Sequence, residues 1–147
     1  MKTIFLSLML ASTFLSGCCS KKTADAKTTE KKTVALYGTN WELEYISGPR
    51  ITFEGLYPDE KPTLVLKSEE NRFGGNSSCN AFSGSYTMKG SNIHFGQAIK
   101  TMRFCEGGGE TTFLNTLGKV NKFEIDSDGK LVLSLDDVPM MRFKPQS

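Results

Sequence analysis

The sequence of 147 residues lacks the motifs that are typical of zinc sites and of phosphate-binding loops. It has a single histidine, His94, and no Cys-x-x-Cys pair, which argues against a zinc site. The glycine-rich segment Gly107–Gly109 lacks the following Lys-Ser or Lys-Thr of a phosphate loop. Residues 34–147 carry no basic block or RNA-binding motif, so nucleic-acid binding is not indicated. We therefore expect no metal and no cofactor.

Long apolar runs are absent as well. The mostly apolar stretch Ile4–Leu15 has 12 residues, whereas a membrane-spanning helix needs roughly 20. With Lys2 before it and small residues after it, the stretch has the pattern of a signal peptide. The segment Leu15–Cys18 (LSGC) resembles the bacterial lipobox, which predicts a signal peptide over residues 1–17 and a lipid on Cys18. An ordinary secretory signal with a cysteine nearby is the alternative.

The lipobox implies a membrane partner. In signals of this kind a diacylglyceryl group first joins the cysteine sulfur, and the signal peptide is then cut off before that cysteine. The amine that the cut creates on the cysteine receives an acyl chain of the palmitate type. Each buried methylene contributes ~0.8 kcal/mol, so several chains anchor a protein stably. Cys19 follows the anchor, where inner-membrane retention would require Asp, and we therefore expect the cell envelope and its outer membrane.

Residues 18–33 are predicted to form a lipidated N-terminus and tether. The part from Ser20 to Thr33 has no large apolar residue, so it cannot bury surface of its own. It holds five lysines against Asp25 and Glu30, a net charge of +3. Such a segment can lie against anionic headgroups or serve as a solvated spacer.

Residues 34–147 are long enough for one domain with its own core. Two cysteines, Cys79 and Cys105, lie in this domain. In an oxidising compartment they suggest a disulfide, which would contribute roughly 3–4 kcal/mol in the chain-entropy model. Two separate buried thiols are the alternative.

Apolar residues alternate with polar ones along most of the domain, which indicates strands. In Trp41–Ile46 the pattern places Trp41, Leu43 and Tyr45 on one face and Glu42 and Glu44 on the other. Tight turns at Lys89–Ser91 and Ser127–Gly129 predict hairpins, the second through its Asp-Gly pair. The strands expected from these signals cover residues 41–46, 63–67, 82–88, 92–95, 123–125, 131–135 and 138–143, with a possible short strand at Ile51–Phe53.

One segment has helical spacing. Glu110–Leu117 places Phe113 and Leu117 four residues apart on one face, and Glu110 suits the positive end of a helix dipole. Gly118 can cap the C-terminal end. We expect a short helix at about residues 108–118 that covers one end of an antiparallel, mainly β meander.

The most distinctive residues lie in Asn76–Tyr86 (NSSCNAFSGSY). With the Trp41-x-Leu43 strand and the Thr101-x-x-x-Cys105 element, they resemble the META domain of the HslJ-type heat-shock lipoprotein family. The match covers about residues 38–144. The motif positions are Gly75, Cys79, Asn80, Ser83, Gly84, Tyr86, Thr101 and Cys105. Ala81 departs from the family pattern, because many relatives carry Arg there, and no role of that arginine transfers to this chain.

The resemblance implies a small lipocalin-like barrel with one helix and a Cys79–Cys105 disulfide. It also implies association with envelope stress, drug tolerance or virulence, but it supplies no common catalytic activity. The residues themselves favour a structural motif. Gly75 and Gly84 permit unusual backbone, Asn80 can hydrogen-bond its own backbone in a turn, and Tyr86 can pack inward.

Three functions remain open at this stage. The first is a non-catalytic envelope lipoprotein that acts in stress response or stability through protein binding. The second is a carrier of a small apolar ligand inside the barrel, lined by phenylalanines. The third, an enzyme such as a carboxylate-dependent hydrolase, has little support, because His94 alternates with apolar residues in a predicted strand. The phenylalanines are more simply core; they are Phe53, Phe73, Phe82, Phe95, Phe104 and Phe143.

Overall fold

The computed structural model describes residues 34–104 and 106–146. The predicted signal peptide, the lipidation of Cys18, the tether and Cys105 lie outside these residues and stay predictions. The elements in chain order are β1 (Trp41–Ile46), α1 (Phe53–Leu56), β2 (Thr63–Lys67), β3 (Arg72–Asn76), β4 (Ala81–Lys89), β5 (Asn92–Phe95), β6 (Ile99–Lys100), α2 (Gly109–Leu117), β7 (Lys122–Ile125), β8 (Leu131–Leu135) and β9 (Val138–Pro145).

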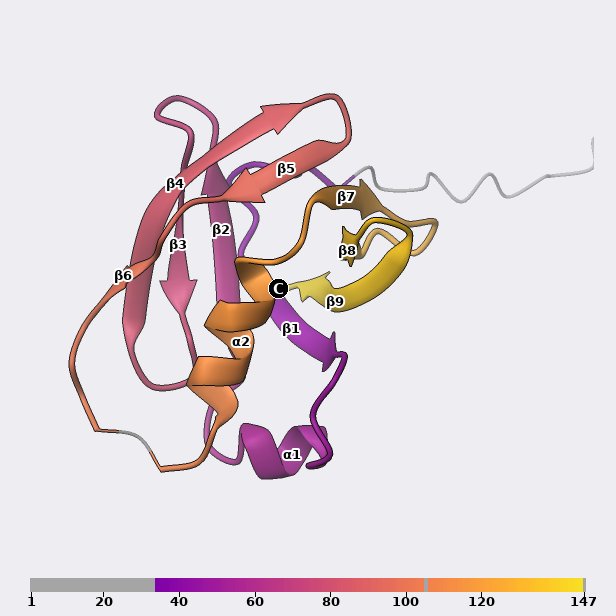
Figure 1. The fold of residues 1–147 in the computed structure, drawn as a ribbon. Coiled ribbons are helices and arrows are strands. Elements are labelled where there is room, and N and C mark those ends of the chain that lie inside the picture. The colour runs from indigo at the N-terminus through magenta and orange to yellow at the C-terminus, as the bar shows by residue number, and fades with distance from the viewer. Residues whose placement is uncertain (1–33, 105, 147) are drawn as a thin grey trace, which may run out of the picture. The chain divides into compact units, whose positions relative to one another are not determined.

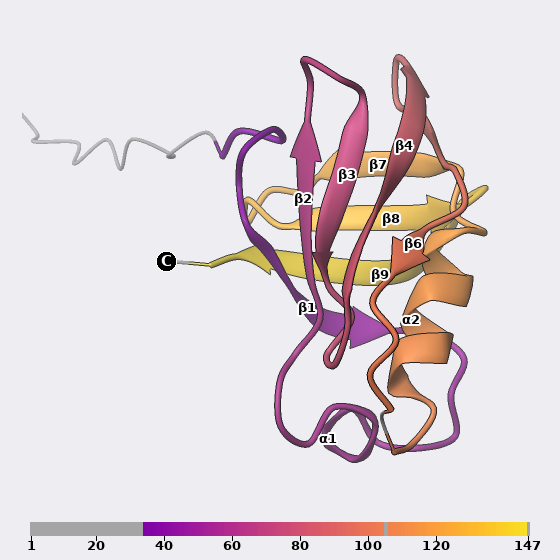
Figure 2. The ribbon, with the colours of Figure 1, turned by 90° about the vertical axis from the view of Figure 1, so that its left-hand side faces the viewer.

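The strands form a closed antiparallel barrel (Figures 1 and 2). Their order is β3-β2-β1-β9-β8-β7-β5-β4, and pairing of β3 with β4 closes the ring of eight strands. The long strand β4 pairs with β3 through its first half and with β5 through its second half. The short β6 lies on the other side of the first half of β4. The predicted mainly β barrel with one short α-helix of more than one turn, α2, is therefore confirmed.

Turn chemistry closes the hairpins where the sequence predicts them. Lys89 pairs with Asn92 around Gly90, which adopts a positive φ of 60°. In the β7–β8 turn the carboxylate of Asp126 accepts hydrogen bonds from the N–H groups of Asp128 and Lys130 at 2.8 and 3.0 Å. These two bonds lower the pKa of Asp126, and the bond from the Lys130 N–H has the larger effect.

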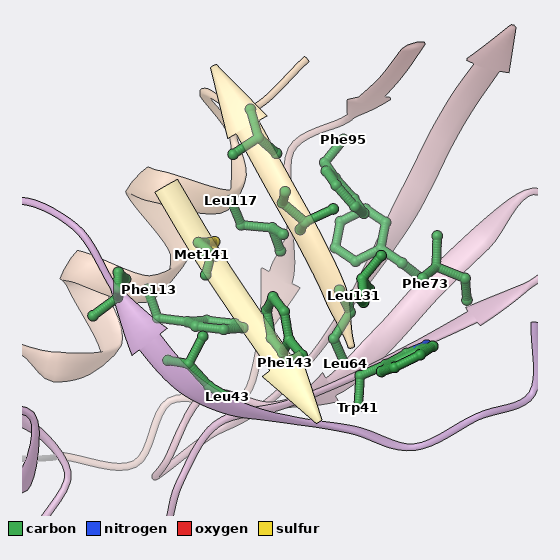
Figure 3. Close-up of a cluster of buried hydrophobic side chains, with 14 of the residues drawn as sticks. Trp41, Leu43, Leu64, Phe73, Phe95, Phe113, Leu117, Leu131, Met141 and Phe143 are labelled. Atoms are coloured by element: carbon green, nitrogen blue, oxygen red, sulfur yellow. The ribbon is translucent and has the colours of Figure 1, made fainter. Parts of the chain in front are cut away.

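A tightly packed set of apolar side chains fills the barrel (Figure 3). Phe113 of α2 is fully buried, and its ring lies 5.5 Å from that of Phe82 and 6.4 Å from that of Phe143. This helix thus covers one side of the barrel with the face that its spacing predicts. The completely buried interior residues are Trp41, Leu43, Leu64, Leu66, Phe113, Leu131, Leu133, Met141 and Phe143. These side chains occupy the described interior of the barrel.

Three local predictions are wrong. The expected strand at Ile51–Phe53 is absent, and the helix α1 begins at Phe53, where the Thr52 hydroxyl caps the N–H of Gly55 at 3.2 Å. Tyr45 is 44% exposed and Ile46 is buried instead, because a bulge between Leu43 and Tyr45 shifts the alternation.

The third error concerns Phe104, expected with the core phenylalanines, which is 90% exposed. A smaller difference affects Leu135, because the period of two in the strand expected at residues 131–135 places it on the same face as Leu131 and Leu133. A register shift between Leu133 and Ser134 turns it partly toward solvent.

Candidate functional site

A buried polar cluster lies in the turn between β3 and β4. Ser77 and Asn80 are both fully buried. The Ser77 N–H donates to the main-chain oxygen of Asn80 at 2.9 Å, and the Ser77 hydroxyl oxygen lies at the same distance from that oxygen. The turn is therefore closed by Ser77, and the Asn80 side chain is left to reach other segments. This corrects the prediction that Asn80 hydrogen-bonds its own backbone.

The Asn80 amide holds the main chain of Arg103. Its Oδ1 accepts from the Arg103 N–H at 2.9 Å and from the Thr101 hydroxyl at 2.7 Å. Its Nδ2 donates to the Arg103 carbonyl at 3.0 Å and to Glu110 Oε2 at 2.8 Å. Two bonds accepted and two donated use the hydrogen-bonding capacity of a primary amide. Asn80 thus clamps both peptide groups of one residue in the segment that follows β6.

Glu110 joins this cluster from the first turn of α2. Its Oε2 also accepts from the Ser77 hydroxyl at 2.7 Å, and its Oε1 forms an ion pair with Lys100 of β6. Burial acts to raise the pKa of Glu110, but hydrogen bonds from Lys100, Ser77 and Asn80 outweigh it and lower the pKa. Glu110 is therefore a structural anion that connects β6, the β3–β4 turn and α2.

The start of α2 is fixed from below by α1. The Tyr57 hydroxyl donates to the main-chain oxygen of Gly109 at 3.1 Å, and burial raises the pKa of Tyr57 to about 12. A Cβ atom at Gly109 would lie 2.3 Å from the main-chain oxygen of Leu56, so only glycine fits there. The position of Glu110, one residue later, depends on this close approach.

The clamped segment presents apolar side chains to solvent. We call residues 101–104 the display loop. Met102 and Phe104, on either side of Arg103, are 91% and 90% exposed. Large apolar groups exposed on a held backbone are the kind of surface that recognises a partner. No pattern in the sequence separated Phe104 from the core phenylalanines.

The glycines and the tyrosine of the motif serve packing. A Cβ atom at Gly75 would lie 2.0 Å from the Thr63 main-chain oxygen. At Gly84 it would lie 2.6 Å from the Phe73 ring. Tyr86 is buried and its hydroxyl donates to the Lys67 carbonyl at 3.2 Å. Ser83 is half-buried in β4 and pairs with both β3 and β6, so these positions fix where β4 passes its neighbours.

Cys79 precedes Asn80 and is disulfide-bonded. Its predicted partner, Cys105, directly follows the display loop in sequence and lies outside the described residues. The Cys79–Cys105 pairing therefore stays a prediction.

The residues considered for catalysis lie apart from this cluster. His94 is exposed on β5, as its alternation with apolar residues predicts. Glu42 and Glu44 form ion pairs across the barrel surface, with Lys144 at 3.0 Å and Lys130 at 2.7 Å. Within residues 34–104 and 106–146, no three His, Cys, Asp or Glu side chains are grouped to hold a metal ion. The helices in this part of the chain are also too short or too polar to cross a membrane.

Comparison with known proteins bears on the fold and family. The model of the META domain family matches residues 34–147. The fold is similar to the NMR structure of a protein from Burkholderia xenovorans, at 24% identity and a TM-score of 0.60, with 76% of this chain and 84% of that chain covered. A second NMR structure is 17% identical, with a TM-score of 0.51 and coverage of 71% and 87%. Comparison with curated proteins finds no match.

Proposed function

The chain belongs to the META domain family, and from this premise we propose that it is a lipid-anchored protein of the bacterial envelope. Its domain binds a protein partner and contributes to envelope stability under stress. The anchor is the lipid on Cys18, and the outer membrane is the expected location. The display loop is the binding surface, and the domain performs no catalysis.

The observation that carries this proposal is the combination of exposure and restraint in the display loop. Two large apolar side chains stand in solvent, while the peptide groups between them are bonded to the buried Asn80 amide. Ordering a loop and its side chains at an interface costs about 0.5–1.5 kcal/mol per side chain, and a loop that is already held avoids part of this cost. The buried cluster thus has a use beyond stability.

The position of the loop suits an anchored binding protein. Val34, from which the chain continues toward the tether, lies beside Gly129 of the β7–β8 turn. Arg103 and Phe104 of the display loop lie beside Leu56, at the end of α1, which Figures 1 and 2 show away from the β7–β8 turn. A domain held to a membrane through its N-terminal end can therefore present the loop away from that membrane.

The filled barrel weakens the alternative of an apolar-ligand carrier. Phe73, Phe82, Phe95 and Phe143 were candidates to line a cavity, and all four are packed into the core. The hydrolase alternative has no support from Glu110 either, because this partly buried carboxylate is engaged in hydrogen bonds and an ion pair. Protein binding is the function we retain.

A matched crosslinking experiment tests the binding surface. The chain is expressed in its host, envelopes are crosslinked, and neighbours are identified by mass spectrometry. A variant with Met102→Ser and Phe104→Ser should lose a reproducible neighbour. A control with Ile51→Ser and Val138→Ser, which removes exposed apolar groups elsewhere, should keep it. Equal loss from both variants, or no neighbour of the unmodified chain, would contradict the proposal.

Intact-mass measurement tests the anchor separately. The chain isolated from its host should lack residues 1–17 and carry the added mass of a diacylglyceryl group and an acyl chain. Cys18→Ser should remove the lipid and release the domain from membranes. An uncut, lipid-free native chain would refute the anchor without bearing on the display loop.

A further inference from the structure

The strand β6 has an open edge. Among the described strands it pairs with β4 alone, through Phe82↔Lys100 and Ser83↔Ile99. The N–H of Thr101 also bonds to β4, at 3.0 Å from the Ala81 oxygen. In an antiparallel ladder, alternate residues direct their main-chain groups to the same side. The N–H and C=O of Lys100 therefore point away from β4.

A groove runs along this open edge. It has a volume of about 350 Å³ and lies between Gly96–Ala98 and Lys100 on one side and the last turns of α2, the helix beside β6 in Figure 2, on the other. Its apolar lining comes from Phe73, Phe95, Leu114 and Leu117. The outward N–H and C=O of Lys100 on one wall and apolar side chains beside them are the features that recognise an added strand.

The charge of the groove restricts what can enter it. Lys100 is the one ionisable residue among those that line the groove, and its Nζ is held by Glu110. A charged group brought into the groove would find no available counter-ion among the lining side chains. The polar members of the lining, Gln97 and Asn115, suit uncharged hydrogen-bonding partners.

We propose that this groove binds an extended, uncharged segment of a partner protein, which adds to β6 as a further antiparallel or parallel strand. This inference rests on the proposed protein-binding function and names the kind of segment bound. A second copy of the chain is a poorer occupant, because its β6 is bonded to its own β4 and would bring that strand against α2. The display loop follows β6 directly, so one partner can contact both.

The test uses the purified mature chain and a panel of acetylated, amidated heptapeptides in which threonine alternates with valine, leucine or phenylalanine. Amide chemical shifts and hydrogen exchange are measured by NMR. At least one peptide should shift resonances along β6 and the facing side of α2 and should protect the Lys100 amide. N-methylation of the peptide on the side facing β6 should weaken binding by about tenfold, the effect of losing one good hydrogen bond. N-methylation at the intervening residues should not.

Two variants separate the strand edge from the ion pair. Lys100→Pro removes the N–H that faces the groove and should weaken peptide binding by about tenfold or more. Lys100→Ala removes the same ion pair with Glu110 but keeps the N–H, and should retain binding. Proline is tolerated at an edge position whose N–H points away from the sheet, so the ladder with β4 should persist.

The outcomes distinguish this inference from the proposed function. Absence of peptide binding, shifts outside the groove, or equal effects of both N-methylation patterns would overturn it. Self-association that disappears with Lys100→Pro would also overturn it in favour of a second copy. If the inference fails while crosslinking still depends on Met102 and Phe104, protein binding through the display loop stands. If crosslinking fails but a peptide binds the groove, the display loop is the part that fails.

Discussion

Replacing Asn80 with alanine should destabilise the domain by about 2–4 kcal/mol. The change removes four hydrogen bonds, at 2.7–3.0 Å, that join three segments of the chain. Each typical bond contributes about 1 kcal/mol net, and buried groups left without partners cost more. Thr101 and Arg103 are exposed residues, so water can replace part of what they lose, while Glu110 keeps its bonds from Ser77 and Lys100. This compensation limits the loss.

Denaturant unfolding of the oxidised chain measures this loss. The midpoint should fall while the slope of the free energy against denaturant stays constant, because the compactness of the two states is unchanged. Asn115→Ala, an exposed replacement of the same type on α2, should remain within about 0.5 kcal/mol of the unmodified chain. A loss below about 1 kcal/mol for Asn80→Ala would refute the role assigned to the amide.

Asn80→Asp tests the direction in which stability changes with pH. The introduced carboxylate keeps the acceptors for Thr101 and Arg103 but faces Glu110 Oε2 where Nδ2 had donated. Two like charges at this distance raise the pKa of one of them in the folded state. The variant should therefore gain stability relative to Asn80→Ala as the pH falls from 7 toward 4, because the folded state takes up a proton. A difference that does not depend on pH would contradict the proximity of the two groups in solution.

Three further predictions concern single side chains. The folded-state pKa of Glu110 is lowered, so the ionised carboxylate stabilises the fold above its unfolded pKa of about 4.3. The stability of the unmodified chain relative to Glu110→Gln should therefore shrink as acid protonates the carboxylate. A relative stability that grows in acid would contradict this sign. Gly84→Ala should cost about 1–3 kcal/mol in denaturant unfolding, because its Cβ would lie 2.6 Å from a buried ring, while Gly108→Ala, whose Cβ meets nothing closer than 4.0 Å, should cost much less. Phe113→Ala should cost about 3–5 kcal/mol and Phe104→Ala almost nothing, and similar losses from both would show that the exposure of Phe104 is wrong.

The sequence predicts the barrel because apolar residues alternate with polar ones along its strands and because its hairpin turns contain glycine, which readily adopts positive φ. Gly90 and Gly129 both adopt positive φ in the hairpins where these turns are expected. The alternation of buried and exposed side chains is not a correct guide where a β-bulge inserts an extra residue into a strand. The bulge after Leu43 turns Tyr45 outward, and no side chain of Trp41–Ile46 marks that change.

The site is harder to predict than the fold, because its contacts join residues far apart in the chain. Asn80 and Thr101 stand out as motif residues, but their bond across 21 positions depends on how β6 runs past β4. The helix dipole is a sufficient local reason for Glu110 at the start of α2, so the sequence gives no reason to expect its bonds with Ser77 and Asn80. Phe104 is of a residue type common in cores, and no local pattern marks it as the exposed neighbour of the clamped Arg103.

Backbone relaxation of the display loop tests most directly whether the buried amide holds an exposed binding surface in one conformation. The ¹⁵N order parameters of Met102, Arg103 and Phe104 should be near 0.85, the value of rigid backbone, although their side chains are in solvent. In Asn80→Ala they should fall toward the range of mobile loops. Values below about 0.6 in the unmodified chain would contradict the account.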